Sequence, residues 1–338
     1  MDELTQGQLL FLACGALGLG IWMLIRGGDT TVNTSVYIAN KFGISPLLVG
    51  FTIVGFGTSL PELIVAINAN LKGAGGIALG NVLGSNIANI LLVIGAAACV
   101  TPLIACPRAL WRDILMMLIS TGILAALLIH GSISALAGGM MLSLLIIYVI
   151  WQAMSFKGKD TDLDIPVEDA SYKNMWLAVS FLILGLALIS LGAEFLVRGA
   201  QVSAAIIGIP DAVIGLTVIA IGTSLPELAT GIAAARRRHT ELLLGNIIGS
   251  NVFNILSILG IASLVQPFTQ ESISPQMVQF DIWAVVGVAL FFSLLVFVFK
   301  KINRTAGILM VVVYCAYIFG LFALYWGDGA TIPSYSPL

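Results

Sequence analysis

One block of polar residues occurs twice in this chain of 338 residues, at a constant offset of 165 positions. The motif GTSLPE at 57–62 returns at 222–227, and GNVLGSN at 80–86 returns as GNIIGSN at 245–251. Over the 47 positions that surround these motifs, 21 residues are identical without a gap. A duplication that keeps Thr, Ser, Glu and Asn in register within apolar sequence predicts one site that is built from two halves.

The composition predicts an all-α, polytopic membrane protein. Hydrophobic residues make up 59% of the chain and charged residues 9%, with a mean hydropathy of +1.05. Globular domains have about 45–50% apolar and about 25% charged residues. We therefore expect a lipid bilayer as the partner of this chain, and neither nucleic acid nor a protein partner. The four scattered cysteines and two histidines predict no resident metal centre and no cofactor.

Ten segments are apolar over about the 20 residues that a helix needs to cross a bilayer. They are 8–32, 44–71, 75–101, 109–129, 132–154, 175–203, 209–235, 241–265, 279–300 and 305–326. Of the 15 Lys and Arg residues, 13 fall in one set of alternate loops and two, Lys72 and Arg198, in the other. The positive-inside rule places the first set in the cytoplasm and both termini outside it.

The two copies of the motif block are expected to cross the membrane in opposite senses. They occupy the second and third spans and then the seventh and eighth, so an odd number of crossings separates them. We therefore predict two inverted five-helix repeats, at 1–154 and 175–338, joined by an acidic cytoplasmic linker at 155–174. The Asp residues of this linker lack the Gly and terminal Glu of an EF-hand, so a solvated linker is the preferred interpretation.

Glu62 and Glu227 are the acidic residues placed most securely inside the hydrocarbon layer. A charged group near the centre of a span costs about 2.5–3.5 kcal/mol on insertion scales. Neither glutamate has a Lys or Arg at comparable depth in its own span. Each carboxylate must therefore be protonated or hold a bound cation.

Further oxygen atoms accompany both glutamates. Hydroxyl groups lie three and four positions before each Glu, and the intervening proline removes a helical hydrogen bond, which is expected to free main-chain carbonyls. A stripe of Ser and Asn follows on the next span of each copy. The predicted cation ligands are Glu62, Glu227, Thr58, Thr223, Ser59, Ser224, Ser85, Ser250, Asn89, Asn254, and the carbonyls near Gly55 and Ala220. Helix packing is the preferred role of Asn81, Asn86, Asn246 and Asn251, and of the GxxxG pairs at 80/84 and 245/249.

An all-oxygen ligand set selects hard cations such as Ca²⁺, Na⁺ or H⁺ over Zn²⁺ or Cu. The chain carries no GxxxxGK[ST] phosphate loop, so an ion gradient rather than ATP is expected to supply the energy.

The doubled motifs resemble the α-repeats of the cation/Ca²⁺ antiporter superfamily, and of the Na⁺/Ca²⁺ exchangers in particular. The resemblance implies that Glu62 and Glu227 are the main Ca²⁺ ligands, with carbonyls from Thr58 and Thr223. The serines and Asn89 and Asn254 would complete Na⁺ sites, with backbone help from Gly55 and Ala220. Some family members carry Asp at the position of Asn254, which weakens a K⁺-cotransporting interpretation.

The resemblance implies a secondary antiporter that exchanges Ca²⁺ for Na⁺ by alternating access, and that is no enzyme. Ca²⁺/H⁺ exchange is the alternative within transport, because a carboxylate also binds a proton. A cation channel is a different class, and an intramembrane enzyme lacks a recognisable catalytic set. The short loops and tails favour a bacterial plasma membrane.

Overall fold

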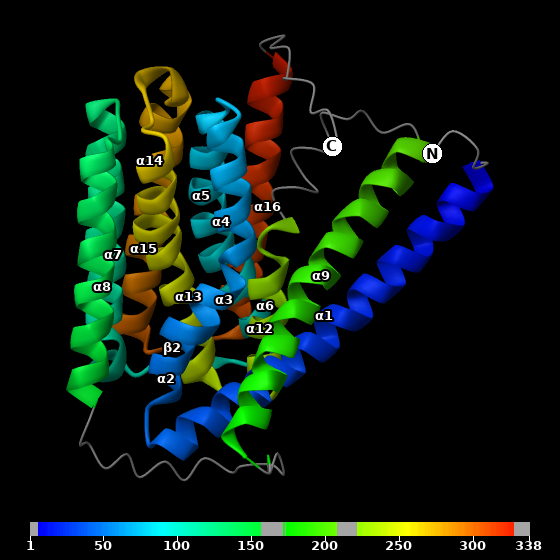
Figure 1. Ribbon diagram of the computed structural model, residues 1–338, viewed down its shortest axis with the longest axis vertical. Helices are drawn as coiled ribbons and strands as arrows, with labels where there is room; N and C mark the ends of the chain where they lie inside the picture. Colours follow the sequence, from blue (N-terminus) through cyan, green and yellow to red (C-terminus); the bar gives the residue numbers. More distant parts are fainter. Residues whose placement is uncertain (1–5, 157–171, 173, 208–221, 328–338) are drawn as a thin grey trace.

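The computed structural model describes residues 6–156, 172, 174–207 and 222–327, and these residues are predominantly helical (Figure 1). Most helices stand side by side, while α1 and α9 cross them obliquely as a pair. In chain order the elements are α1 (Gln6–Phe42), α2 (Pro46–Val49), the π-helical η1 (Gly50–Val54), α3 (Gly55–Thr58), α4 (Leu60–Leu71), α5 (Gly75–Ala88), the π-helical η2 (Asn89–Ile94), α6 (Gly95–Val100), β1 (Leu103–Ile104), α7 (Pro107–His130), α8 (Ala135–Phe156), α9 (Met175–Ile207), α12 (Leu225–Arg236), α13 (Thr240–Phe253), the π-helical η4 (Asn254–Leu259), α14 (Gly260–Val265), the 3₁₀-helical η5 (Gln270–Ser272), the π-helical η6 (Met277–Asp281), α15 (Ile282–Leu294), the π-helical η7 (Leu295–Phe299), β2 (Lys301–Ile302) and α16 (Arg304–Gly327).

Seven of the described helical stretches are long and apolar enough to cross a membrane. An eighth span results if Pro46–Thr58 and Leu60–Leu71, which meet at 42°, are taken together, and Arg304–Gly320 adds a shorter apolar helix. The predicted span 209–235 is described only from Gly222 onward, and most of the linker 155–174 also lies outside the described residues. An integral membrane protein built from helices is confirmed.

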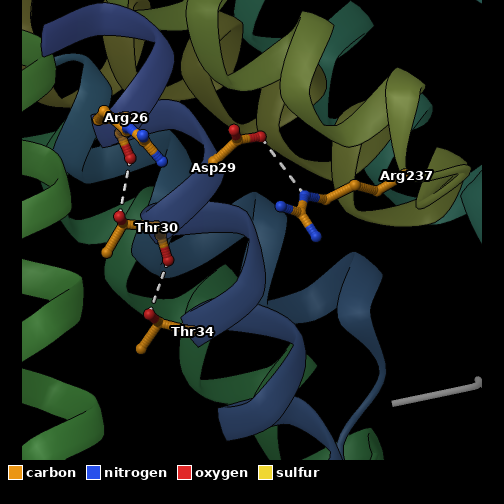
Figure 2. A network of polar contacts seen from close by, with 5 residues as sticks. All are labelled: Arg26, Asp29, Thr30, Thr34 and Arg237. Atoms are coloured by element: carbon orange, nitrogen blue, oxygen red, sulfur yellow. Dashed lines mark hydrogen bonds and ion pairs between the residues drawn. The ribbon is translucent and has the colours of Figure 1, made fainter. Parts of the chain in front are cut away.

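The helix α1 continues ten residues beyond the predicted end of the first span at residue 32. In its polar stretch, two threonine hydroxyls bond back to carbonyls one turn earlier. Thr30 Oγ1 donates to the Arg26 carbonyl at 2.7 Å, and Thr34 Oγ1 donates to the Thr30 carbonyl at 2.6 Å (Figure 2). Thr34 Oγ1 also lies 2.9 Å from the Tyr172 hydroxyl, so its side chain has one partner within the helix and one outside it.

The duplication is also visible in the boundaries of the elements. The pairs α4 and α12, α5 and α13, η2 and η4, and α6 and α14 each begin and end 165 residues apart. The two copies of the motif block therefore fold into the same sequence of helical and π-helical turns.

The second copy packs its α13 directly against the start of the first copy. The contacts follow the same order along both segments of the chain: Leu47 lies against Gly245, Phe51 against Gly249, and Gly55 against Ser250. Further along, Asn70 Nδ2 donates to the carbonyls of Ala262 and Gln266 at 3.0 and 2.6 Å. Thus α13 and α14 run in the same direction as α2 to α4, whereas α5 and α6 return after a short turn at 72–74. In Figure 1, α14 accordingly lies near the upper end of the bundle and α6 near the lower end.

The helices α1 and α9 meet through glycines that the duplication also relates. A Cβ atom at Gly20 would lie 2.7 Å from the carbonyl oxygen of Gly192, and one at Gly27 would lie 2.8 Å from that of Gly185. Gly185 and Gly192 stand 165 positions after Gly20 and Gly27, so the two contacts are reciprocal. The absence of side chains lets the backbones approach closely, as small residues do in membrane helices.

An ion pair connects α1 with the second copy. Arg237 Nε, in the turn after α12, lies 3.4 Å from Asp29 Oδ1 (Figure 2). Glu194 takes the position of Asp29 in the second half, but it pairs with Arg198 on its own helix, where both side chains are exposed. The two equivalent acids therefore have different partners.

Short backbone pairings cross between the halves at two places. The strand β1 pairs antiparallel with β2, with Leu103 opposite Ile302. Ile133 forms an antiparallel bridge with Phe268. In each case, the segment that follows the motif block of one half pairs with the last helical hairpin of the other.

Close packing between the halves depends on Gly245 and Gly249. Added Cβ atoms would lie 2.3 Å from the Leu47 carbonyl oxygen and 2.2 Å from that of Phe51. In the first copy, a Cβ at Gly80 would reach only Met277 Cε at 3.8 Å, and nothing described lies within 4 Å of one at Gly84. Among the described residues, the predicted small-residue contact is thus formed by the second copy.

Gly249→Ala is therefore expected to lower the free energy of unfolding by about 1–3 kcal/mol or more, because a main-chain atom cannot move aside as a side chain can. Thermal unfolding of the detergent-purified protein measures this loss. Gly122→Ala is the control, since Gly122 is an exposed residue of α7 with nothing within 4 Å of its added Cβ. Equal melting temperatures for the two variants would contradict the packing argument.

Candidate cation-binding site

Two helix breaks place the glutamates at the starts of helices. The helix stops at Ser59 (φ −84°, ψ 1°) and restarts as α4, with Pro61 near its N-terminus and Glu62 in its first turn. Ser224 (φ −90°, ψ 4°) precedes α12 in the same way, with Glu227 in the first turn. The partial positive charge of a helix N-terminus favours a carboxylate at this position. The same local sequence therefore builds the same acid-bearing turn twice.

The two carboxylates are buried and unpaired. Glu62 is 1% exposed and Glu227 is 0% exposed. None of their four oxygens has a hydrogen-bond partner in the described structure, and the two side chains are close enough to repel one another electrostatically. The ion pairs found among the described residues involve Glu194 and Asp29 instead. Both acids are therefore buried without a described hydrogen-bond partner, and they interact with each other electrostatically.

A third buried acid in the described part of the chain shows how a satisfied carboxylate differs. Asp113, on α7, accepts hydrogen bonds from the Tyr148 hydroxyl and from Gln152 Nε2, the latter at 2.6 Å. Both donors lie on α8, so this acid joins two neighbouring helices. Asp113 is therefore explained by helix packing, whereas the two glutamates are not.

Hydroxyl groups from both halves surround Glu227. Thr58, Ser59 and Ser250 lie close enough to its carboxylate to interact with its charge. Thr58 Oγ1 is 3.3 Å from Ser250 Oγ, and Ser250 Oγ donates to the Gly55 carbonyl at 3.3 Å. Residues of the first half thus line the acid of the second, as a shared site requires.

The carbonyl of Gly55 differs from the prediction that the proline kink leaves it poorly paired. It accepts the backbone N–H of Ser59 at 3.2 Å, besides the hydroxyl of Ser250. The reason is that Pro61 removes a donor further along the chain, while Ser59 still closes the turn before the break. Ala220, its counterpart in the second half, lies outside the described residues.

Most of the remaining predicted ligands are buried without a partner. Such unpartnered atoms in the described structure are Ser59 Oγ, Ser85 Oγ, Asn89 Oδ1, Thr223 Oγ1, Ser224 Oγ, and Nδ2 and Oδ1 of Asn254. Each such group costs about 1–3 kcal/mol when it is left unsatisfied. These unsatisfied atoms lie in the duplicated segments, so this part of the described structure has polar groups available to a ligand.

The two asparagines of this set also mark a change in helix geometry. Asn89 is the first residue of the π-helical η2, and Asn254 is the first residue of the π-helical η4. Single π-helical turns inside α-helices often occur at functional sites. These turns could not be predicted from the sequence, because no proline or glycine stands at either asparagine.

Two hydrogen bonds of Asn246 could not be predicted from the sequence. Asn246 Nδ2 donates to Thr230 Oγ1 at 3.0 Å, while Asn246 Oδ1 accepts from Thr58 Oγ1 at 3.4 Å. Thr230 escaped notice because the position is Val65 in the first half, so the duplication does not repeat it. Asn246 was assigned to helix packing, and its amide does join α12 to α13.

A helical membrane bundle that buries unpaired acids beside other polar side chains is typical of ion-transporting membrane proteins. Comparison with known proteins gives the class more closely. The chain matches the sodium/calcium exchanger protein family over residues 12–154 and 177–323, and it belongs to that family.

Named relatives and a solved structure are similar over nearly the whole chain. The putative antiporter CaxA of Alkalimonas amylolytica is 34% identical over 90% of this chain and 97% of its own length. The sodium/calcium exchanger MaX1 of Methanosarcina acetivorans is 33% identical, with the same two coverages. The structure of the sodium-calcium exchanger NCX_Mj, soaked with 10 mM Na⁺ and zero Ca²⁺, matches with a TM-score of 0.79 and 34% identity. That match covers 92% of this chain and 99% of the other.

Because a buried carboxylate without a cation must take up a proton, and an amide need not, Glu62→Gln is expected to raise the melting temperature in cation-free buffer with a chelator. An amide removes one charge at nearly constant volume, and a gain of about 1 kcal/mol corresponds to roughly 2–4 °C. Glu194→Gln is the control, since its exposed ion pair contributes little. A melting temperature of Glu62→Gln at or below that of the unmodified chain would contradict the electrostatic argument.

Proposed function

We propose that this chain is a secondary active antiporter that exchanges Ca²⁺ for Na⁺ across the membrane. The observation that carries the proposal is the pair of buried carboxylates, Glu62 and Glu227, whose four oxygens have no hydrogen-bond partner in the described structure. Hydroxyls of both halves lie close to Glu227. Their two negative charges equal the charge of one Ca²⁺, which prefers carboxylate, carbonyl and amide oxygens. Membership in the sodium/calcium exchanger family supports the choice of these ions.

The neutral oxygens around the carboxylates suit Na⁺. Hydroxyls of Ser59, Ser85, Ser224 and Ser250 and the amides of Asn89 and Asn254 carry no charge, so they favour a monovalent ion over a divalent one. Thr58, Thr223, Gly55 and Ala220 would add main-chain carbonyls. Several Na⁺ ions and one Ca²⁺ ion would then compete for the same two acids. This competition would couple the transport of one ion to that of the other.

Alternating access would follow from two inverted five-helix repeats, 1–154 and 175–338, within a ten-span protein. Three observations support this arrangement: equal element boundaries at an offset of 165, the parallel course of α13 with α2 to α4, and the reciprocal glycine contacts of α1 and α9. Rocking of one structural unit against another around a fixed site is the usual mechanism of such repeats. The loop charges support termini outside the cytoplasm, and the short loops and tails support a bacterial plasma membrane.

Ca²⁺/H⁺ exchange is the second candidate. Glu62 and Glu227 have no cationic partner among the described residues, and a proton neutralises a carboxylate as a metal ion does. The relative CaxA carries the general description of a putative antiporter, whereas MaX1 is described as a sodium/calcium exchanger. The counter-ion therefore has to be found by experiment.

Loss of either buried acid is expected to abolish exchange. Vesicles that contain Glu62→Gln or Glu227→Gln should take up ⁴⁵Ca²⁺ no faster than protein-free vesicles, because an amide cannot balance the charge of Ca²⁺. Glu194→Gln, which alters an exposed acid of α9, should keep the rate of the unmodified chain. Normal uptake by both buried-acid variants would rule out this site.

The counter-ion is tested by changing only the gradient. Vesicles loaded with Na⁺ and diluted into Na⁺-free medium are expected to accumulate ⁴⁵Ca²⁺, and a proton ionophore should leave this uptake unchanged. A pH gradient without Na⁺ should drive none. Uptake driven by the pH gradient alone would favour Ca²⁺/H⁺ exchange, and flux far above carrier turnover rates would indicate a channel.

A further inference from the structure

A hydrogen bond crosses between the halves at one of the proposed ligands. Asn89, the first residue of η2, donates from Nδ2 to Oδ1 of Asn251 on α13 at 3.0 Å. Both side chains are buried, with exposures of 0% and 2%. A residue that was assigned to helix packing from the sequence therefore touches a ligand candidate directly.

The surroundings of Asn251 fix the direction of this bond. Its Nδ2 donates to the main-chain carbonyl of Asn86 at 3.4 Å, and a carbonyl can only accept. The Oδ1 of Asn251 must then face Asn89, so the group that Asn89 presents to it must be the donor. As a result, Asn89 Oδ1 lies on the other side of its amide, where it has no protein partner in the described structure.

The equivalent residues of the other half do not form this contact. Asn86, which stands 165 positions before Asn251, donates from Nδ2 to the Val82 carbonyl of its own helix at 2.7 Å. Its potential partner Asn254 is left with both amide atoms unpartnered. The orientation of Asn89 is thus held by a neighbour, whereas that of Asn254 is not.

We propose that Asn251 is a positioning residue, which turns the amide of Asn89 so that its oxygen is available to a bound Na⁺. The inference rests on the proposed function and names one determinant of Na⁺ affinity at that site. It also gives Asn86 and Asn251 different roles, although the two asparagines occupy equivalent and equally buried positions. An amide held in place binds a cation better than one that must first be oriented, because the ordering cost is already met.

The matched pair Asn251→Ala and Asn86→Ala tests this role in vesicles by Na⁺-driven ⁴⁵Ca²⁺ uptake. Asn251→Ala should raise the half-saturating Na⁺ concentration about three- to tenfold, the effect of one lost hydrogen bond. The maximal rate should stay within about twofold, since the acids remain. Asn86→Ala should keep the half-saturating Na⁺ concentration of the unmodified chain.

A double-mutant cycle separates positioning from a general structural effect. If Asn251 acts through Asn89, then Asn251→Ala should have no further effect on Na⁺ affinity in an Asn89→Ala background. Additive losses, or equal losses in Asn251→Ala and Asn86→Ala, would overturn the assignment. Asn251→Ser provides a second variant should the alanine variant fail to fold, with folding judged by size-exclusion chromatography and the melting temperature.

The unmodified chain separates the two hypotheses. If it shows no Na⁺-driven uptake, the proposed function fails. If it is active and Asn251→Ala behaves as the unmodified chain does, the positioning role fails while the proposed function stands.

Discussion

The burial of two carboxylates without a protein partner is the constraint on which the rest of this structure depends. Glu62 and Glu227 are placed at helix starts by two chain breaks, and no described cationic side chain pairs with them. Such an arrangement is unfavourable within a bundle, so the surrounding packing has to hold it together. Gly245 and Gly249 do so by bringing α13 against α2 and η1 at distances that no larger residue allows. Backbone contact thereby brings the two halves together directly beside the polar groups, since Ser250 follows Gly249 in the chain.

The residues proposed for the centre of the site could be selected from the sequence because the duplication singles them out. Thr58, Ser59 and Glu62 are repeated in register, and an apolar chain has few other reasons to keep them twice. It could not predict what differs between the halves. Thr230 bonds Asn246, but Val65 holds the equivalent position, and Asn251 and Asn86 are identical in sequence yet have different partners. Those roles depend on which helix packs against each residue, and a sequence motif does not contain that information. Residues 209–221 of the predicted seventh span, Ala220 among them, are not described by the structure, so the predictions for them stand as made.

Near-symmetry in sequence therefore accompanies asymmetry in contacts. Asp29 reaches Arg237 of the other half, while its equivalent Glu194 bonds within its own helix. Asn89 is held across the interface, and Asn254 is not. A transporter that alternates between two states needs its halves to exchange environments, and a structure in one state then displays one of the two sets of contacts.

The crossed pairings of β1 with β2 and of Ile133 with Phe268 bear on biogenesis. The ribosome has to complete the last hairpin before Leu103 finds its partner, nearly 200 residues later in the chain. Until then, the main-chain groups of Leu103 and Ile104 have no strand to pair with. Premature termination of synthesis would leave them unpaired. A gene split between the halves would yield two fragments that are each incomplete alone and able to mature only after meeting.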